Sequence, residues 1–175
     1  GVLAALAEQD KLKDIEVIST VSGGSILGVY YYLLLKKQLE SKEDGEVNYI
    51  DVVKTLERQF LVSILKNLRM RVFSNFFKNL KMVFYKNYSR TNRLGELYQE
   101  FLYDNVLQLN GKPCQYMHEL IIVPKDQKNF SITTDNWNSK NKVPQLVLNS
   151  TSVNSGLIFQ FSASWMGEPP GHIHP

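Results

Sequence analysis

A serine lies at a sharp break between two regular segments of this chain, and that break restricts the possible folds more than any other feature. The β-branched run Ile15–Ser19 is typical of a short strand, and Ser25–Glu40 carries apolar residues at helical spacing. Between them lies Thr20-Val21-Ser22-Gly23-Gly24, whose glycines end the strand pattern before the helix begins. A strand, a tight turn and a helix in this order indicate an α/β layer with a parallel sheet.

The same turn has the layout of a serine nucleophile. A serine hydroxyl attacks an acyl carbon when the backbone holds it clear of the chain, near a base and near amide donors for the developing oxyanion. A strand-to-helix turn places Ser22 at its apex and points the N–H of Gly23 into the site, with Gly24 and Ser25 as small residues opening the helix. Thr20 occupies the first small position of the usual Gly-x-Ser-x-Gly pattern, which is a departure from it.

Two other interpretations of the turn stay open on the residues alone. It is compatible with a flexible strand-to-helix connection that has no chemistry. It is also compatible with a loop that cradles phosphate, although a Walker-type loop has Lys and Ser or Thr after its last glycine, and Ser25-Ile26-Leu27 lacks that pair.

The pattern along the rest of the chain predicts helices first and strands last. We expect helices over residues 1–9, Tyr49–Leu65, Leu68–Tyr88 and Arg93–Tyr103, the last capped by Thr91 or Asn92, with a polar loop over 41–48. Short β-rich runs follow at Leu120–Val123, Phe130–Thr133, Gln145–Thr151 and Leu157–Ser162. Asn154-Ser155-Gly156 is the predicted hairpin turn between the last two.

Two stretches of the chain resemble the patatin-like phospholipase family. The first joins Gly1-Val2-Leu3-Ala4-Ala5-Leu6-Ala7-Glu8 to Ile18-Ser19-Thr20-Val21-Ser22-Gly23-Gly24-Ser25-Ile26-Leu27-Gly28. In that family a similar helix, strand and nucleophile turn follow a Gly-rich loop. The second stretch, Pro144–Thr151 with Asn154-Ser155-Gly156 and Phe159–Ser162, is similar to the family's strand pair downstream of a helical insertion.

The resemblance implies an α/β fold with a parallel-sheet hydrolase core and a helical insertion. We expect residues 1–175 to form one partial patatin-like domain, truncated at both ends. Its parts are helix, nucleophile turn and helix over 1–40, a basic helical insertion over 41–110, and a β-rich segment over 111–175.

The resemblance also implies lipid acyl ester hydrolysis by a Ser–Asp dyad without any cofactor. Ser22 carries over as the nucleophile and Gly23 as an oxyanion donor. The family's Gly-rich oxyanion loop would precede Gly1, and its aspartate, in an Asp-Gly-Gly or Asp-Gly-Ala turn, would follow Pro175. We interpret Asp44-Gly45 as an ordinary polar turn. We therefore expect the full-length parent to be an enzyme and this stretch alone to be inactive.

Charge is distributed unevenly along the chain. Residues 58–93 hold nine Lys and Arg and no acid, interleaved with aromatic residues. Such a segment suits an anionic membrane surface, with aromatics entering the interface and cations meeting phosphates. It is also compatible with a solvated cationic face on core-packed helices. We expect no nucleic-acid partner, because no nucleic-acid motif accompanies the charge.

Several smaller features carry little chemistry. Cys114 is interpreted as a small hydrophobe, and the pair His172 and His174 lacks the further ligands that a metal site needs, so we expect no metal. Two alternatives to the Ser–Asp enzyme remain at this level. One is a non-catalytic lipid-surface binding module that retains the fold, and the other is a serine hydrolase that uses histidine.

Overall fold

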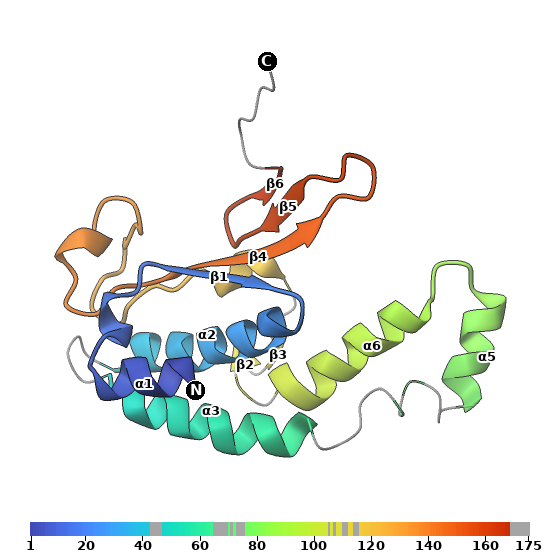
Figure 1. The fold of residues 1–175 in the computed structure, drawn as a ribbon, viewed down its shortest axis with the longest axis horizontal. Helices are drawn as coiled ribbons and strands as arrows, with labels where there is room; N and C mark the ends of the chain where they lie inside the picture. The colour runs from blue at the N-terminus through green and yellow to red at the C-terminus, as the bar shows by residue number, and fades with distance from the viewer. Residues whose placement is uncertain are drawn as a thin grey trace.

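A computed structural model of the chain describes residues 1–42, 47–64, 70, 72, 76–104, 106, 108–109, 112–113 and 116–168. Figure 1 shows helices α1 (Val2–Glu8), α2 (Gly23–Ser41) and α3 (Tyr49–Ile64) stacked on one side of a four-stranded sheet. Helices α5 (Phe76–Phe84) and α6 (Arg90–Tyr98) form an arm that extends away from this body. None of the helices in the described part of the chain is long and apolar enough to cross a membrane.

The predicted strand, turn and helix are confirmed, and the turn is tighter than the pattern indicated. Strand β1 spans Val17–Val21 and α2 begins at Gly23, so Ser22 alone separates the two elements. Every residue from Tyr30 to Lys36 is buried, which places the middle of α2 in the core rather than at a surface. A helix that is apolar on all sides is stable only when neighbours cover it, and here the sheet and α3 do so.

The sheet is mixed, with strand order β1-β4-β5-β6. Strand β4 (Gln145–Thr151) runs parallel to β1, whereas β5 (Ile158–Phe161) and β6 (Met166–Gly167) add antiparallel pairs. The expectation of a parallel sheet therefore holds only for β1 and β4 among the described strands. The hairpin between β4 and β5 is confirmed, and Gly156 takes a φ of 70° in its turn, a conformation that favours glycine.

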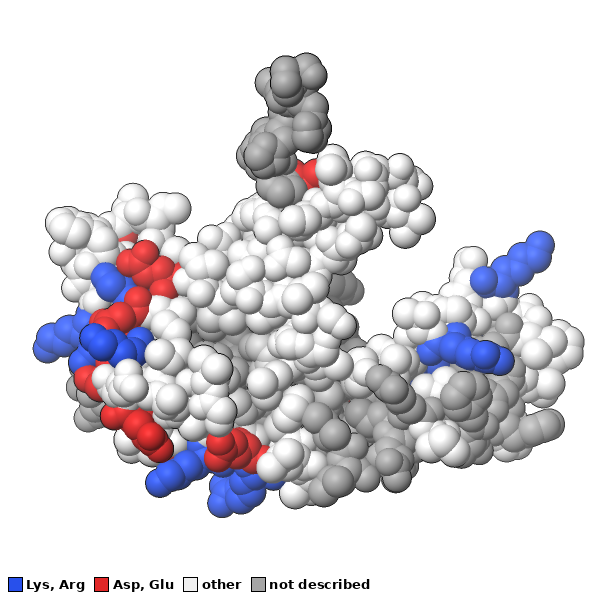
Figure 2. Space-filling view, viewed as in Figure 1, with Lys and Arg blue, Asp and Glu red and all other residues white. Residues whose placement is uncertain are grey.

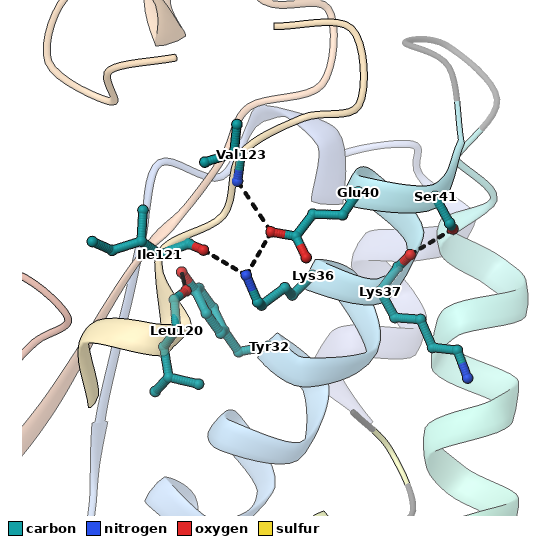
Figure 3. Close-up of polar contacts among 8 residues, drawn as sticks. All are labelled: Tyr32, Lys36, Lys37, Glu40, Ser41, Leu120, Ile121 and Val123. Atoms are coloured by element: carbon teal, nitrogen blue, oxygen red, sulfur yellow. Dashed lines mark hydrogen bonds and ion pairs between the residues drawn. The ribbon is translucent and has the colours of Figure 1, made fainter. Parts of the chain in front are cut away.

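Two predicted strands are wrong. Leu120 ends a short 3₁₀ helix (Met117–Leu120), and Ile121–Val123 continues from it without pairing to any described strand. Phe130–Thr133 is an irregular segment that ends in a turn. In Figure 3 the first segment is held instead by side chains of α2. The Tyr32 hydroxyl donates to Leu120 O at 2.9 Å, the Lys36 ammonium donates to Ile121 O, and Val123 N–H donates to Glu40 Oε1 at 3.2 Å.

Helices form in the middle of the chain as predicted, but the helix predicted over Leu68–Tyr88 ends at Phe84. Helix α3 buries Val52, Val53 and Leu56 against the core. Helix α6 begins at Arg90, capped by Ser89 and not by Thr91 or Asn92: Asn92 N–H donates to Ser89 Oγ, and Ser89 N–H donates to Asn92 Oδ1 at 3.0 Å. This reciprocal pair is a capping box, so the helix starts earlier than predicted.

The remaining elements complete the helical part. A π-helical turn, Gln99–Tyr103, continues α6, and a small antiparallel pair joins β2 (Gln108–Leu109) to β3 (Lys112–Pro113). Residues 65–69, 71 and 73–75 of the predicted helix Leu68–Tyr88 and its approach lie outside the described residues, as do Asp44-Gly45, Cys114 and the His172 and His174 pair.

Candidate active site

Ser22 lies exposed at the carboxyl end of β1 in an unusual backbone conformation. Its φ is 52° and its ψ is −128°. A side chain with Cβ enters this region only at a cost of about 1–3 kcal/mol, so the surrounding structure must hold it there. Asp10 is the other residue with a side chain that has a positive φ among those described. Strain of this kind at a strand-to-helix turn is the geometry that exposes a serine hydroxyl.

The Ser22 hydroxyl does not cap the helix that follows it. Ser22 is the N-cap of α2, yet its side chain makes no capping hydrogen bond, while its carbonyl accepts from Ser25 N–H at 3.0 Å. The N–H groups of Gly23 and Gly24, the first two helical residues, have no partner within the helix. Together with the helix dipole, they offer donors to an anion beside the serine.

Open space surrounds the first turn of α2. A Cβ added to Gly23 or to Gly24 would meet no atom within 4 Å, and neither glycine has a positive φ. Packing therefore does not require glycine at either position. The space around Ser22 and the Gly23 N–H is therefore open.

Gly28 explains how Thr20 fits where the usual pattern has a small residue. A Cβ added to Gly28 would lie 2.5 Å from Thr20 Cγ2, so β1 and α2 touch at this point because residue 28 has no side chain. The Thr20 hydroxyl donates to Val147 O at 3.4 Å on the neighbouring strand. The space that a small residue at position 20 would leave in the usual pattern is provided here by the glycine at position 28 of the helix.

Asn149 is a polar residue beside the turn to which the sequence assigned no role. It stands opposite Val21 in the parallel register of β1 and β4, and its amide Nδ2 lies 2.9 Å from Thr20 O. An asparagine within a strand does not indicate a site from sequence alone. The parallel register of β1 and β4 is what brings Asn149 next to the turn.

A tyrosine near the start of α2 is not a candidate base. The Tyr103 hydroxyl donates to Ile26 O at 3.5 Å. Burial, with a smaller contribution from Tyr98, raises the pKa of the Tyr103 phenol well above its ordinary value. The phenol therefore stays protonated at neutral pH and acts as a donor that docks the π-helical turn onto α2.

The basic segment is described in part, and its described end exposes large apolar side chains. In α5, Phe77 is 81% exposed and Val83 is 78% exposed, and Phe84 follows at 73%. Lys81 Nζ lies 4.4 Å from the centre of the Tyr88 ring. In Figure 2 the charged side chains visible on the α5–α6 arm are blue, whereas acidic side chains gather mainly at the opposite end of the body.

Metal ligands do not gather in the part of the chain that the structure describes. Within it, no group of three or more His, Cys, Asp and Glu side chains is placed to hold an ion.

Comparison with known proteins adds one finding. A family model described as patatin-like phospholipase matches residues 1–163. That range includes Ser22 and its flanking elements, the helical middle and the β4–β5 pair. Comparison with curated proteins and with solved structures gave no match.

Proposed function

This chain belongs to the patatin-like phospholipase family, and we propose on that premise that its protein hydrolyses acyl esters of lipids with Ser22 as the nucleophile. The observation that carries the proposal is the strained backbone of Ser22, at φ 52° and ψ −128°, between β1 and α2. We further propose that residues 1–175 belong to one domain, with the nucleophile turn in 1–40, a basic helical insertion in 41–110 and a β-rich segment in 111–175.

The proposed reaction has two steps. Ser22 Oγ attacks the ester carbonyl carbon as its proton passes to a carboxylate base, and the carbonyl oxygen becomes an oxyanion that accepts from Gly23 N–H. As this intermediate collapses, the ester bond breaks, the base returns its proton to the leaving alkoxide to release the alcohol, and an acyl-serine remains. Water then gives a proton to the same base and attacks the acyl-serine, and the base passes that proton to Ser22 Oγ as the fatty acid leaves. No cofactor takes part.

The base and the second oxyanion donor are the parts that the resemblance assigns to an aspartate turn and a Gly-rich loop outside these 175 residues. Removing one member of such a catalytic unit abolishes most of its rate enhancement. We therefore propose that the isolated 175-residue chain turns over esters poorly. Turnover of a p-nitrophenyl ester by this chain, lost in Ser22→Ala, would contradict that part while supporting Ser22.

A fluorophosphonate probe tests the nucleophile. In a protein that carries this chain together with the aspartate turn, we expect the probe to label Ser22, and Ser22→Ala to abolish labelling. Ser25→Ala is the matched control, because it removes a hydroxyl one helical turn away and should leave labelling intact. A folded protein that the probe does not label would favour the alternative, a non-catalytic lipid-surface binding module.

The exposed face of α5 supports a proposal about where the protein meets its substrate. Phe77, Val83 and Phe84 project apolar surface, and the neighbouring Lys81 and Lys86 are exposed cations. We place peripheral contact with an anionic membrane here, within the basic segment 58–93. Co-sedimentation with vesicles with and without anionic lipid tests this contact.

A further inference from the structure

We propose that Asn149 is a positioning residue for Ser22, which holds the end of β1 so that the nucleophile keeps its strained backbone. This inference rests on the proposed function of Ser22. It starts from a row of three polar side chains that crosses β1, β4 and β5 and ends beside the turn. The row is formed by Ser19, Asn149 and Gln160.

Asn149 uses both ends of its amide. Its Nδ2 donates to Thr20 O and to Ser19 Oγ, each at 2.9 Å, and its Oδ1 accepts from Gln160 Nε2 at 2.8 Å. Thr20 O is only an acceptor, so the nitrogen of the amide must face β1. Gln160, opposite Asn149 in the antiparallel register, fixes the amide from the other strand.

The hydrogen bond from Asn149 to Thr20 O lies close to Ser22 along the chain. Thr20 O belongs to the peptide unit that leads into Val21, the last residue before Ser22. On its other side, Thr20 is fixed by the close approach of its Cγ2 to Gly28 and by its own hydrogen bond to Val147 O. The strand is thus held from the sheet and from the helix immediately before the strained residue.

This arrangement fits a strained conformation better than it fits the stability of the sheet alone. A residue at φ 52° relaxes unless its neighbours over-determine its position. The backbone angles of Ser22 set the direction of both its hydroxyl and the following N–H. A displacement of about 1 Å in such groups lowers a rate about 100-fold.

Kinetics of the protein that carries this chain test the role of Asn149. We expect Asn149→Ala to lower kcat and the rate of fluorophosphonate labelling about 10- to 100-fold, with KM nearly unchanged, because in this role the residue acts on the backbone before Ser22 and not on the substrate. Asn149→Asp should do no better, because a carboxylate cannot donate to Thr20 O. Ser19→Ala is the control, since it removes one partner of Nδ2 and leaves the bond to Thr20 O.

A second measurement keeps the inference separate from the proposed function. If Asn149 holds Ser22 under strain, Asn149→Ala removes hydrogen bonds from the wild type but also releases some of that strain, which offsets part of the loss. In a Ser22→Gly background there is no strain to release, so Asn149→Ala should lower Tm by more. This comparison needs no activity. Equal losses in the two backgrounds, or unchanged labelling of a folded Asn149→Ala protein, would overturn the inference. A wild type that the probe does not label overturns the proposed function, and the Tm comparison then decides on Asn149 alone.

Discussion

Thr20 and Gly28 meet where α2 packs on β1, and a Cβ on Gly28 would lie 2.5 Å from Thr20 Cγ2. Other atoms of Thr20 lie at ordinary contact distance from that Cβ: its own Cβ at 3.5 Å and Oγ1 at 3.6 Å. A single methyl group therefore decides whether a side chain fits at residue 28. Because the contact lies two residues before Ser22, it also ties the packing of the helix to the nucleophile turn.

This contact predicts that the effect of Gly28→Ala changes sign with residue 20. In the wild type the extra methyl overpacks the interface, and we expect a loss of about 1–3 kcal/mol in the free energy of unfolding. In a Thr20→Ala background the clash is gone, and Gly28→Ala should be neutral or stabilising by up to about 1 kcal/mol, because alanine is the better helix former. Urea denaturation of the four proteins measures the effect. The same loss in both backgrounds would contradict it.

Ser22 should be a residue whose replacement by glycine stabilises the fold. Glycine adopts φ 52° without the clash that a Cβ creates, so Ser22→Gly releases strain of about 1–3 kcal/mol. Part of that gain is lost because glycine gives the unfolded chain more conformational entropy. We therefore expect the free energy of unfolding of Ser22→Gly to be about 1 kcal/mol higher than that of Ser22→Ala. Both variants lack the hydroxyl, so the comparison isolates the backbone. Equal stabilities measured by thermal or urea unfolding would contradict this prediction, and a Ser22→Gly protein less stable than Ser22→Ala by the entropic cost of glycine would show that Ser22 carries no strain.

The parts of the fold that follow from local pattern were predictable. The strand, turn and helix around Ser22 depend on neighbouring residues, and so does the β4–β5 hairpin with Gly156 at its turn. The start of α6 was mispredicted because Ser89 and Asn92 cap each other, which moves the boundary toward the N-terminus.

What depends on distant partners could not be predicted. Leu120–Val123 has strand composition, but Tyr32, Lys36 and Glu40 of α2 take up its backbone groups in place of a neighbouring strand. The site has the same limit. Ser22 and Gly23 are proposed from their own segment, whereas the contacts of Gly28 and Asn149 arise only from the packing of α2 and the register of β4.

Lys36 should matter for stability although it bears a charge. It is 3% exposed, pairs with Glu40 and donates to Ile121 O. Lys36→Met leaves both acceptors without this donor, and we expect a loss of about 1–3 kcal/mol in the free energy of unfolding. Lys37 is the matched control, because it is the next residue of α2 and is exposed, and Figure 3 shows its side chain pointing away from the cluster. Similar losses in Lys36→Met and Lys37→Met would contradict the assigned role.

Buried phenols should make the fold sensitive to alkali. Burial raises the pKa of Tyr31, Tyr32 and Tyr103 above the ordinary value of 10.0. Above about pH 10 the unfolded chain loses these protons and the folded chain keeps them, so stability falls as pH rises, by up to about 1.4 kcal/mol per pH unit for each group.

Tyr103→Phe tests one of these groups. Its hydroxyl makes a long hydrogen bond of 3.5 Å to Ile26 O, so we expect little change at pH 7. Between pH 10 and 11 the variant should lose less stability than the wild type, because one fewer proton distinguishes the two states. Parallel stability curves for Tyr103→Phe and the wild type would show that this phenol does not contribute.

The α5 surface predicts separable effects of charge and apolar area on membrane binding. Lys81→Glu should weaken binding to vesicles that contain anionic lipid by about 5- to 30-fold, because a cation near such a surface contributes about 1 kcal/mol and the change also adds an anion. Phe84→Ser removes apolar area from the interface and should weaken binding to neutral and anionic vesicles alike. Lys11→Glu makes the same change of charge at an exposed site near α1 and should have little effect.

Co-sedimentation with vesicles measures the binding of all three variants. Equal weakening by Lys81→Glu and Lys11→Glu would mean that net charge acts without a local docking face, and binding that is indifferent to lipid charge would contradict the electrostatic contact.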